Sequence, residues 1–559
     1  MNIRVVVGRR RSAAICALSL VAFALYLVAT TPLRHWIVDD AGVSFAYARS
    51  LASNRGLVSQ PDAPRVEGYS NFAWVALLSC AVRLQLFDPI WSPKIISGAL
   101  VLGTLLLLAI VLVRSGAGLA GVALALLLVA GNTSLVVWTS SGMANALYDL
   151  LAVLLVIALA SRHALAPYAA GIVAALMGAT RVEGVAFGVA LLLWPLIAGR
   201  VSRDVLPRLW PRAARGILTF TLLYGAYTAF RVLYFGRFLP PLIDAPFKNG
   251  RQALSFDTLV HTFSLSDGTA SALADLSHAA FGVVGSWVVA ISFALLCRSL
   301  LRRRWVTAEA AALWLVLLVA AGVYAAMPRD WMGEYRFGTV FIVLAAPAVV
   351  ALASTSASKA RWSPLRRGLI AAAIVASAAV DFWGRNRDFS RDPTVPFARI
   401  ERRAMSIAAW ARDAGVRGRT LLCADAGGTL WNAELDLVDL GGLTDPAFAR
   451  KFTDEKTELV DYLLGKRRPA LIEIHGYWTR YARLDSDPRF WSDYVPLVEY
   501  DDAWLKKRSA STLVSGVYAR RDLVDREKLG ELQKRLSRLS AVDLADQLGL
   551  DLKIVGNVR

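Results

Sequence analysis

The segment RHWIVDDAGVSFAYARSLASNRGLVSQPDAPRVEGYSNFAW (residues 34–74) is a largely polar stretch that follows the first long apolar window of the chain. That window, ICALSLVAFALYLVAT (residues 15–30), comes after arginines at 9–11 and has no convincing small-residue cleavage site, so it predicts an anchor with a cytoplasmic N-terminus. Similar windows of roughly 20 residues, the length that a bilayer crossing needs, recur as far as Phe382 and then stop. We therefore expect a polytopic helical membrane protein in which residues 34–74 belong to the first outer loop.

The composition agrees with a membrane protein and excludes other classes. Of 559 residues, 56% are apolar and the mean hydropathy is +0.48, whereas soluble proteins have about 45–50% apolar residues. The net charge of +19 is concentrated in short clusters between apolar windows, which is typical of topology signals and not of a nucleic-acid-binding face. The cysteines have no spacing of a disulfide framework, and the histidines have none of a zinc cage.

Charge placement limits how many windows cross the bilayer. The sequence has about twelve apolar windows, and an odd number of them precede the arginine-rich stretch at 200–215. Because arginine clusters favour the cytoplasmic side, an even number of crossings should precede this stretch. One of the preceding windows should therefore not cross the bilayer. The weakest of them, FAWVALLSCAVRLQLF (residues 72–87), carries Arg83 and Gln85 near its end, and a charge deep in a bilayer is costly. We therefore expect an interfacial helix there, about eleven spans, and an extracytoplasmic C-terminal domain.

This reasoning divides the chain into two parts. Residues 1–383 form the membrane module, with a first outer loop at 31–91 and a further outer loop at 237–279. Residues 384–559 form an extracytoplasmic α/β domain, because short apolar runs alternate there with helical patterns. The runs are RTLLCADA, LDLVDL, PALIEIHG, YVPLVEY and STLVSGVYA. Shorter polar stretches expected on the outer face are SSGMAN (140–145), ATRVEG (179–184) and PRDWMGEYRF (328–337).

The adjacent aspartates Asp39 and Asp40 are the strongest candidates for chemistry. At the outer rim of a membrane, one carboxylate can accept a proton from an acceptor hydroxyl while the other holds a hydroxyl, a metal ion or the acceptor. Adjacent helical residues point about 100° apart, so both serve one site only where the backbone is irregular or the site surrounds them. The alternative is that the pair caps the helix expected at 41–53, a position that Asp favours. The residues themselves leave both roles open.

Basic residues near the outer face are candidates for binding a lipid phosphate, whose charge an arginine fork or a lysine neutralises. The candidates are Arg181, Arg231, Lys248 and Arg336. Arg231 is the strongest, because TAFRVLYFG places it near the outer end of a span, where an unpaired cation is expensive. Its alternative role is snorkelling to the interface. The alternative for Arg181 is an ion pair with Glu183 that braces a turn between helices.

Several segments resemble a known family. DDAGVSFAYARSL, RGLV and RVEGYSNFAW resemble the D-D-A-x-I-S-F-R-Y-A-x-N-L, G-L-V and R-V-E-G-Y-T-N-x-L-W signature of GT-C membrane glycosyltransferases related to the mycobacterial terminal β-arabinofuranosyltransferase. WTSSGMANALYDLL is similar to S-G-L-E-T-x-L, TRVEG to T-R-P-E-G, and FRVLYFGRFLPP with Lys248 to R-x-x-Y-F-G-x-x-L-P-N-T-x-x-A-K. DWMGEYRF is similar to G-D-W-M-x-x-Y-R-F, and DLGGLTDPAFAR to D-L-x-G-L-x-D-P-x-I-A-R. The resemblance spans most of the chain.

The resemblance implies a GT-C fold and an inverting transfer of a sugar, arabinofuranose-like or another pentose or hexose, from a polyprenyl phosphate to an extracytoplasmic glycan or lipid. It implies Asp39 as the general base, Asp40 as a supporting carboxylate, and the four basic residues at the donor phosphate. The substrate contacts that it implies are Glu67, Tyr69, Asn71, Asp330 and Trp331. No cofactor is required. The possibility of a divalent cation shared between an aspartate and the substrate phosphate stays open. The expected location is the cell membrane, with the bilayer, a lipid-linked sugar and an envelope glycan as partners.

The chain departs from the family pattern at three positions. Gly42 replaces an aromatic residue, Ala46 an arginine, and Ala144 the family glutamate. Asp149 lies roughly 140° further around the helix and a turn deeper, so it is a poor substitute for that glutamate. These losses motivate an alternative, a weak or inactive GT-C-fold protein that binds glycan or assists envelope assembly. A transporter is disfavoured, because no paired Gly/Pro-interrupted spans indicate inverted repeats.

Overall fold

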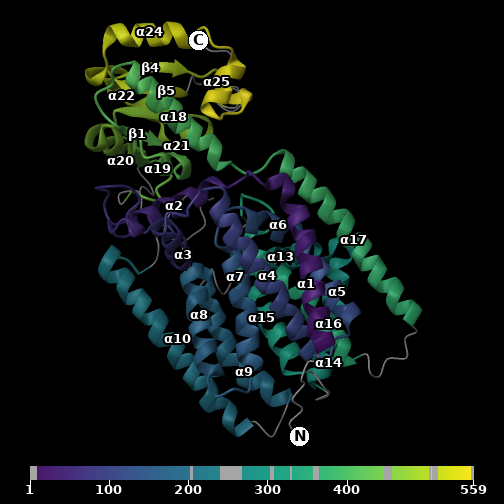
Figure 1. Ribbon diagram of the computed structural model, residues 1–559. Helices are drawn as coiled ribbons and strands as arrows, with labels where there is room; N and C mark the ends of the chain where they lie inside the picture. The colour runs from purple at the N-terminus through teal and green to yellow at the C-terminus, as the bar shows by residue number, and fades with distance from the viewer. Residues whose placement is uncertain are drawn as a thin grey trace.

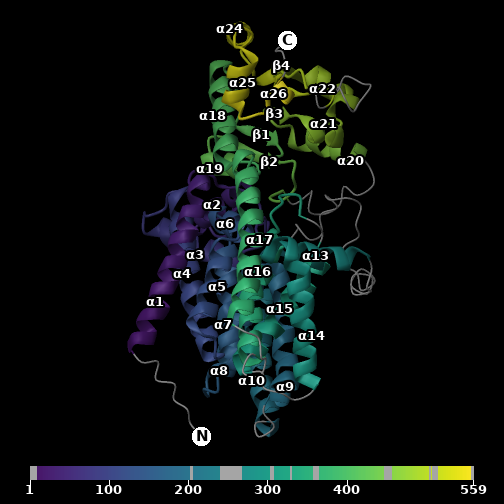
Figure 2. The same ribbon diagram turned by 90° about the vertical axis from the view of Figure 1, so that its right-hand side faces the viewer.

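The computed structural model describes residues 9–201, 206–238, 267–301, 307–327, 330–356, 364–445, 456–502, 505 and 514–555. A bundle of long helices forms one part of the molecule, and a smaller α/β domain sits on one end of the bundle (Figures 1 and 2). Helix α1 (Arg9–Thr30) runs from the opposite end of the bundle toward this domain. We call the end of the bundle that meets the domain the domain-facing end.

Eight helical stretches in the described part of the chain are long and apolar enough to cross a membrane. Their helices are α1, α4 (Trp91–Arg114), α9 (Gly188–Val201), α10 (Leu206–Phe235), α13 (Asp267–Phe281) with α14 (Gly285–Leu301), α15 (Ala308–Ala326), α16 (Thr339–Ser356) and α17 (Pro364–Arg391). A pair bent by 53°, α5 (Leu119–Ala130) and α6 (Thr133–Ser140), is a ninth candidate. The shorter apolar helices α7 (Asn145–Ala160) and α8 (Ala166–Thr180) lie where two further spans were expected, so eight or nine of the roughly eleven expected spans have the length and composition of a crossing in the described part of the chain. The chain is a multi-pass membrane protein.

The loops expected on the outer face contain helices of their own. In the first loop, α2 (Asp39–Ala52) agrees with the helix expected at 41–53, and α3 (Phe72–Arg83) packs beside it. Helix α3 has 12 residues, too few to cross a bilayer, and its terminal Arg83 is exposed. The loop expected at 237–279 is helical from Asp267 onward, and its residues 239–266 lie outside the described residues.

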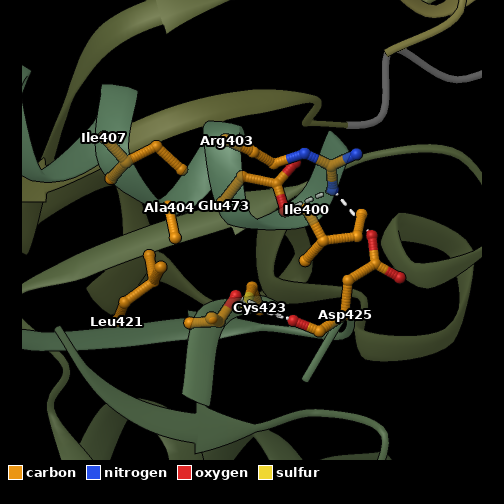
Figure 3. Close-up of a pocket in the computed structure, with 9 residues that line it drawn as sticks. Ile400, Arg403, Ala404, Ile407, Leu421, Cys423, Asp425 and Glu473 are labelled. Atoms are coloured by element: carbon orange, nitrogen blue, oxygen red, sulfur yellow. Dashed lines mark hydrogen bonds and ion pairs between the residues drawn. The ribbon is translucent and has the colours of Figure 1, made fainter. Parts of the chain in front are cut away.

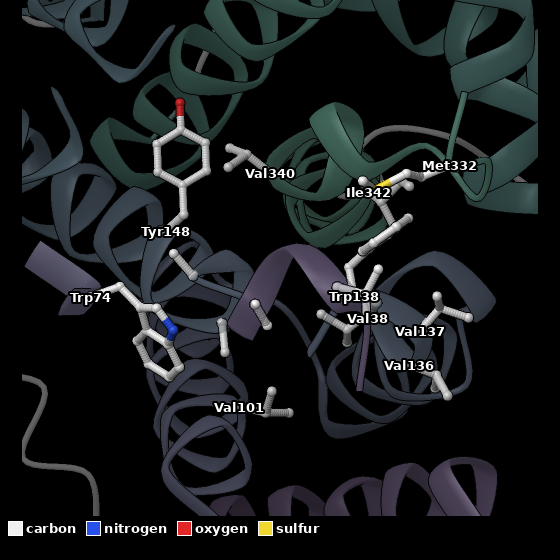
Figure 4. Packing of buried hydrophobic residues seen from close by; sticks show 14 of the residues in the cluster. Val38, Trp74, Val101, Val136, Val137, Trp138, Tyr148, Met332, Val340 and Ile342 are labelled. Carbon is white, nitrogen blue, oxygen red and sulfur yellow. The ribbon is translucent and has the colours of Figure 1, made fainter. Parts of the chain in front are cut away.

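Buried indoles connect the segments at the domain-facing end. Trp74 and Trp138 are fully buried in the bundle core (Figure 4). The indole N–H of Trp74 donates to the carbonyl of Gly142 at 3.0 Å, and that of Trp138 donates to the carbonyl of Glu334 at 2.8 Å. A buried indole needs such a partner for its N–H. The two bonds tie the first loop to SSGMAN, and α6 to PRDWMGEYRF.

The C-terminal domain is built on a five-stranded sheet of order β2-β1-β3-β5-β4. Strand β1 is parallel to β2 and β3, and β5 is antiparallel to β3 and β4. The strands are β1 (Thr420–Cys423), β2 (Asp436–Asp439), β3 (Leu471–Ile474), β4 (Tyr494–Glu499) and β5 (Gly516–Arg520), one for each predicted apolar run. Helix α18 (Phe397–Asp413) packs against the C-terminal helices α24 (Arg526–Leu536) and α25 (Ala541–Leu548). The boundary expected after residue 383 falls within α17, which continues to Arg391.

Backbone hydrogen bonds join the first loop to the start of the C-terminal domain. The N–H of Asp39 donates to the carbonyl of Val395 at 2.9 Å, and the N–H of Phe397 donates to the carbonyl of Ile37 at 2.8 Å. Helix α2 then packs against the short helix α19 (Gly427–Asn432), which follows β1. The residues just before α2 are therefore paired with the segment that enters the domain.

Candidate active site

Four segments that are far apart in the sequence meet at the domain-facing end. The carboxylate Oδ2 of Asp40, in the first loop, lies 3.8 Å from Nη1 of Arg336. The same Nη1 lies 3.8 Å from the sulfur of Met143 in SSGMAN. The ring of Phe337 is flanked by the guanidinium groups of Arg336, at 4.8 Å, and of Arg181 in ATRVEG, at 4.9 Å. The stretches expected on the outer face therefore converge around the contact between Asp40 and Arg336.

One edge of the Arg336 guanidinium is fixed, and the other faces weaker partners. Its Nε and Nη2 lie 2.8 and 3.3 Å from the two carboxylate oxygens of Asp330, and the side chains of Arg336 and Asp330 are 11% and 7% exposed. Its Nη1 instead lies 3.0 Å from the thioether sulfur of Met332 and 3.8 Å from the carboxylate of Asp40. A thioether is a weak acceptor. Nη1 therefore retains the capacity to bind an anionic oxygen.

Asp39 has surroundings opposite to those of Asp40. Asp39 is 6% exposed, and its Oδ2 and Oδ1 accept hydrogen bonds from the N–H groups of Gly427 and Gly428 at 3.0 and 2.8 Å. Burial and the nearby charge of Asp425 raise the pKa of Asp39 to about 8, against the lowering effect of these bonds. The side chain of Asp40 is 40% exposed. The assignment of Asp39 as base stays a prediction, and these contacts favour the reverse order of roles.

Arg181 stands beside the site with a partner of its own. It is 8% exposed, and its Nε donates to the carboxylate of Glu183, so the ion pair anticipated as its alternative role is present. The guanidinium also lies over the rings of Phe337 and Tyr148, at 4.9 and 5.8 Å. Arg181 therefore brings a partly compensated positive charge to the same ring that Arg336 contacts.

Arg231 and Glu67 form a separate and fully buried ion pair. Nε of Arg231 lies 3.0 and 2.9 Å from the two oxygens of Glu67, and Nη2 lies 2.8 Å from Oε2. The remaining nitrogen, Nη1, donates to the carbonyl of Phe238 at 2.9 Å. Both residues were expected to contact substrate, yet each has the other as its partner, which braces the first loop against α10. The expected phosphate ligand Lys248 lies outside the described residues.

The other expected substrate residues fall into two groups. Asp330 and Trp331 belong to the segment that carries Arg336, and Trp331 is 53% exposed. Tyr69 and Asn71 are buried within the first loop. The ring of Tyr69 packs on that of Tyr47 at 4.8 Å, and the Asn71 side-chain amide donates to the hydroxyl of Ser44 at 3.0 Å.

A second polar cluster lies inside the C-terminal domain, around β1 and β3 (Figure 3). Nη1 of Arg403 lies 2.7 Å from the carboxylate of Asp425 and 3.6 Å from that of Glu473. Nδ1 of His475 is 2.7 Å from Glu473. Burial acts to raise the pKa of Glu473, but the charges of His475 and Arg403 together hold it below its ordinary value. The cluster is an internally compensated ion network, and it places the carboxylate of Asp425 near Asp39.

Comparison with known proteins places this geometry in a known fold. No curated protein matches the chain in sequence. Residues 397–520 match the model of a domain of unknown function, DUF8728. The chain resembles the oligosaccharyltransferase AglB from Archaeoglobus fulgidus in complex with an inhibitory peptide and a dolichol-phosphate, with TM-score 0.52, 12% identity and coverage of 82% of this chain and 69% of that one. It also resembles ArnT from Cupriavidus metallidurans bound to undecaprenyl phosphate, with TM-score 0.52, 14% identity and coverage of 91% and 98%. The chain has a GT-C-like fold.

Two residues of the GT-C-like bundle were not recognised as important from the sequence. Asp149, in α7, is 1% exposed, so its carboxylate is enclosed within the bundle. Nζ of Lys94 donates to the carbonyls of Leu33, Trp36 and Ser140 at 3.0, 2.7 and 2.6 Å. In the sequence, the presence of a lysine in the first turn of an apolar span could have indicated that Lys94 has a specific partner. Lys94 fixes the chain that leads into the first loop.

The possibility of a divalent cation was also left open by the sequence. Within the ranges that the structure describes, no group of three or more His, Cys, Asp and Glu side chains is arranged to hold a metal ion. A cation at Asp40 would therefore complete its coordination with substrate oxygens and water, as Mg²⁺ does in many phosphate-binding sites.

Proposed function

We propose that the chain is a membrane glycosyltransferase that moves a sugar from a polyprenyl-phosphate donor to an acceptor hydroxyl outside the cytoplasm. The observation that carries this proposal is the partly exposed carboxylate of Asp40 next to the guanidinium of Arg336, where the four outer segments meet. A lipid-phosphate donor is supported by the dolichol-phosphate bound to AglB and the undecaprenyl phosphate bound to ArnT. The proposed sugar is arabinofuranose-like or another pentose or hexose, and the proposed acceptor is an envelope glycan or lipid.

In the proposed reaction, Asp40 takes the proton of the acceptor hydroxyl while the acceptor oxygen attacks the anomeric carbon. The bond from that carbon to the phosphate oxygen breaks, the configuration inverts, and the polyprenyl phosphate leaves with the electron pair. Arg336 and Arg181, on either side of Phe337, stabilise the charge that grows on the phosphate. A direct displacement needs one base and forms no covalent enzyme intermediate.

Geometry is the reason for assigning the base to Asp40. A base must come within hydrogen-bond reach of the proton that it abstracts, and both oxygens of Asp39 are buried and already accept backbone hydrogen bonds. The contact of 3.8 Å between Asp40 and Arg336 is longer than a hydrogen bond. A bound donor can therefore separate the two groups, with its phosphate on Arg336 and the acceptor on Asp40.

The other expected residues take supporting parts in this proposal. The half-exposed Trp331 stacks on a sugar ring, and Lys248 contributes to neutralising the donor phosphate. The residues with a purely structural part are Glu67, Tyr69, Asn71 and Arg231. The domain-facing end lies outside the cytoplasm in this proposal, because the arginine clusters are then cytoplasmic.

A second candidate function is a GT-C-fold protein without turnover that binds a glycan or assists envelope assembly. Residue 144, where the resembling family has a glutamate, is an alanine that is 2% exposed at the start of α7. The variant Ala144→Glu separates the two functions. Increased sugar transfer would identify a weakened enzyme, whereas absence of transfer in both wild type and variant would identify a binding protein.

Complementation of a deletion strain, followed by analysis of its envelope glycans, tests the proposed transfer. Wild type should restore the missing linkage, whereas Asp40→Asn should fail, because a general base contributes about 10²–10⁴-fold to a rate. Asp62→Asn is the matched control, since Asp62 is an exposed carboxylate of the same loop, and it should restore the linkage. Wild-type rates of transfer in both Asp40→Asn and Asp39→Asn would contradict the catalytic function.

A further inference from the structure

Helix α19 of the C-terminal domain depends on the first loop for its N-terminal cap. The first N–H groups of a helix have no partners within the helix, and the N-cap residue of α19 is Ala426, which has no side-chain acceptor. The carboxylate of Asp39, 388 residues away from Gly427, accepts the N–H groups of Gly427 and Gly428 instead. Asp39 is the first residue of α2, whose own N-cap is Val38. The capping role suggested by the sequence is therefore directed to a different helix.

The other end of α19 is held by the same helix α2. Nη1 and Nη2 of Arg49, in the last turn of α2, donate to the carbonyls of Trp431 and Leu430 at 2.7 and 2.9 Å. The guanidinium also lies 4.9 Å from the centre of the Trp431 ring. Asp39, at the start of α2, thus accepts hydrogen bonds from the start of α19, and Arg49, at the end of α2, donates to the end of α19. The two helices therefore run side by side in the same direction.

Glycines allow the backbones of the two helices to meet. A Cβ at Gly42 would lie 2.5 Å from the carbonyl carbon of Gly427, and a Cβ at Gly427 would lie 1.7 Å from the carbonyl oxygen of Asp39. No side chain fits at such distances without a shift of the backbone. Gly42 is the position where the resembling family has an aromatic residue. In this chain that departure is explained by the close approach of α19.

A third contact ties the first loop to the edge of the sheet. The side-chain amide of Gln60 accepts the N–H of Leu437 at 2.8 Å and donates to its carbonyl at 2.9 Å. Leu437 lies in β2, one of the two edge strands of the sheet. An edge strand leaves backbone groups without strand partners, and Gln60 pairs with them as another strand would.

We infer that the C-terminal domain contributes to the active site, because its helix α19 holds α2 in place through contacts with Asp39, Gly42 and Arg49. We call this set of contacts the clamp, and Asp39 is its positioning residue. Adjacent residues of a helix point about 100° apart, so an Asp39 held by the domain directs Asp40 toward Arg336. The domain that matches a family of unknown function thus sets the position of the base without touching substrate. The inference rests on the proposed function for the identity of the base.

Hydrogen exchange of α2 and steady-state kinetics of the full-length protein test the clamp, with synthetic undecaprenyl-phosphate arabinofuranose as donor. Asp39→Ala removes both acceptor oxygens, whereas Gly427→Ala separates the helices without removing any carboxylate from the chain. Each variant should speed the exchange of α2 amides and lower kcat by about 100-fold, the cost of a displacement of about 1 Å at a reacting group. Because both substitutions break the same contact, kcat of the double variant should be little lower than kcat of either single variant.

The conservative variant Asp39→Asn distinguishes positioning from catalysis. Its amide oxygen still accepts one glycine N–H, so a positioning role predicts a kcat within about 10-fold of wild type, the value of one net hydrogen bond. An amide cannot act as a base, so a catalytic role predicts a loss as large as that of Asp39→Ala. Gly530→Ala is the control, since a Cβ at that glycine of α24 meets nothing within 4 Å. It should change neither the exchange of α2 nor kcat.

Two results would overturn the inference. One is wild-type exchange of α2 in both Asp39→Ala and Gly427→Ala, and the other is an Asp39→Asn variant as inactive as Asp39→Ala. Failure of the proposed function has a different signature. Hydrogen exchange of the α2 amides would then rise in both variants while wild type transfers no sugar. The contact between α2 and α19 would be confirmed, and its proposed contribution to catalysis would be wrong.

Discussion

Two contacts between an arginine and a carboxylate, both formed by the first loop, differ in nearly every property. Arg231 and Glu67 are each 2% exposed and are joined by three contacts of 2.8, 2.9 and 3.0 Å. Asp40 has a 40% exposed side chain and stands 3.8 Å from Arg336. The first pair is fully enclosed, whereas the second has a partly exposed carboxylate and a guanidinium nitrogen, Nη1 of Arg336, that faces the weak thioether acceptor of Met332. The same residue types therefore brace a loop in one place and remain available for chemistry in the other, according to burial and geometry.

The largest effect is expected from breaking the enclosed pair of Arg231 and Glu67. Glu67→Gln leaves the guanidinium of Arg231 buried without its counter-charge, and loss of one partner of a buried pair costs about 3–5 kcal/mol of stability. Thermal unfolding in detergent should show a clear fall in Tm. Glu309→Gln, in the pair with the half-exposed Arg114, is the control and should cost less than about 1 kcal/mol. Equal Tm values for the two variants would contradict the bracing role.

The next largest effect is expected at the partly exposed pair. Arg336→Gln removes the proposed ligand of the departing phosphate, and loss of one such donor lowers kcat by about 10²–10³-fold. Steady-state transfer from undecaprenyl-phosphate arabinofuranose measures this loss. Arg55→Gln, at an exposed arginine of the first loop, should leave kcat unchanged. If Arg336→Gln lowered only Tm, Arg336 would have a structural role like that of Arg231.

A smaller effect is expected from pH at Asp39. Burial, followed by the charges of Asp425 and Asp40, raises its folded-state pKa from 3.8 to about 8. Between those values the folded chain holds a proton that the unfolded chain has lost, so this contribution to stability falls as pH rises. The slope is at most about 1.4 kcal/mol per pH unit. Asp39→Asn does not titrate, so its Tm should rise relative to that of wild type from pH 5 to pH 8. A constant difference between the two Tm values would contradict the raised pKa.

The smallest effect is expected at the aromatic residues near each pair. Trp331→Ala should raise KM for the sugar donor by roughly 2-fold to 10-fold, the equivalent of about 0.5–1.5 kcal/mol for one aromatic contact, without a change in Tm. Tyr69→Phe is the matched change beside Glu67. The Tyr69 hydroxyl is buried with no hydrogen-bond partner among the described residues, so its removal should leave KM unchanged and should not lower Tm. A rise in KM for Tyr69→Phe would place Tyr69 at the substrate.

Hydropathy predicted the architecture well, because the length of an apolar window reflects the local requirements of a bilayer. The windows, the short helix at Phe72–Arg83 and the five strands of the tail appear where periodicity and turn residues placed them. The role of each cation depends on partners that the sequence does not place. Arg231 was the first candidate because an unpaired cation at its depth is expensive, and the structure supplies the pairing carboxylate of Glu67 from another segment.

The sequence by itself determined that the chain crosses a membrane repeatedly, that it ends in an α/β domain, and that an aspartate pair lies at the start of a loop helix. Each of these follows from neighbouring residues. Only the tertiary structure decided that Asp39 binds the backbone of Gly427 and Gly428 whereas Asp40 stands beside Arg336. The physical reason is that the protonation and availability of a carboxylate depend on burial and hydrogen-bond partners, and these partners come from residues hundreds of positions away.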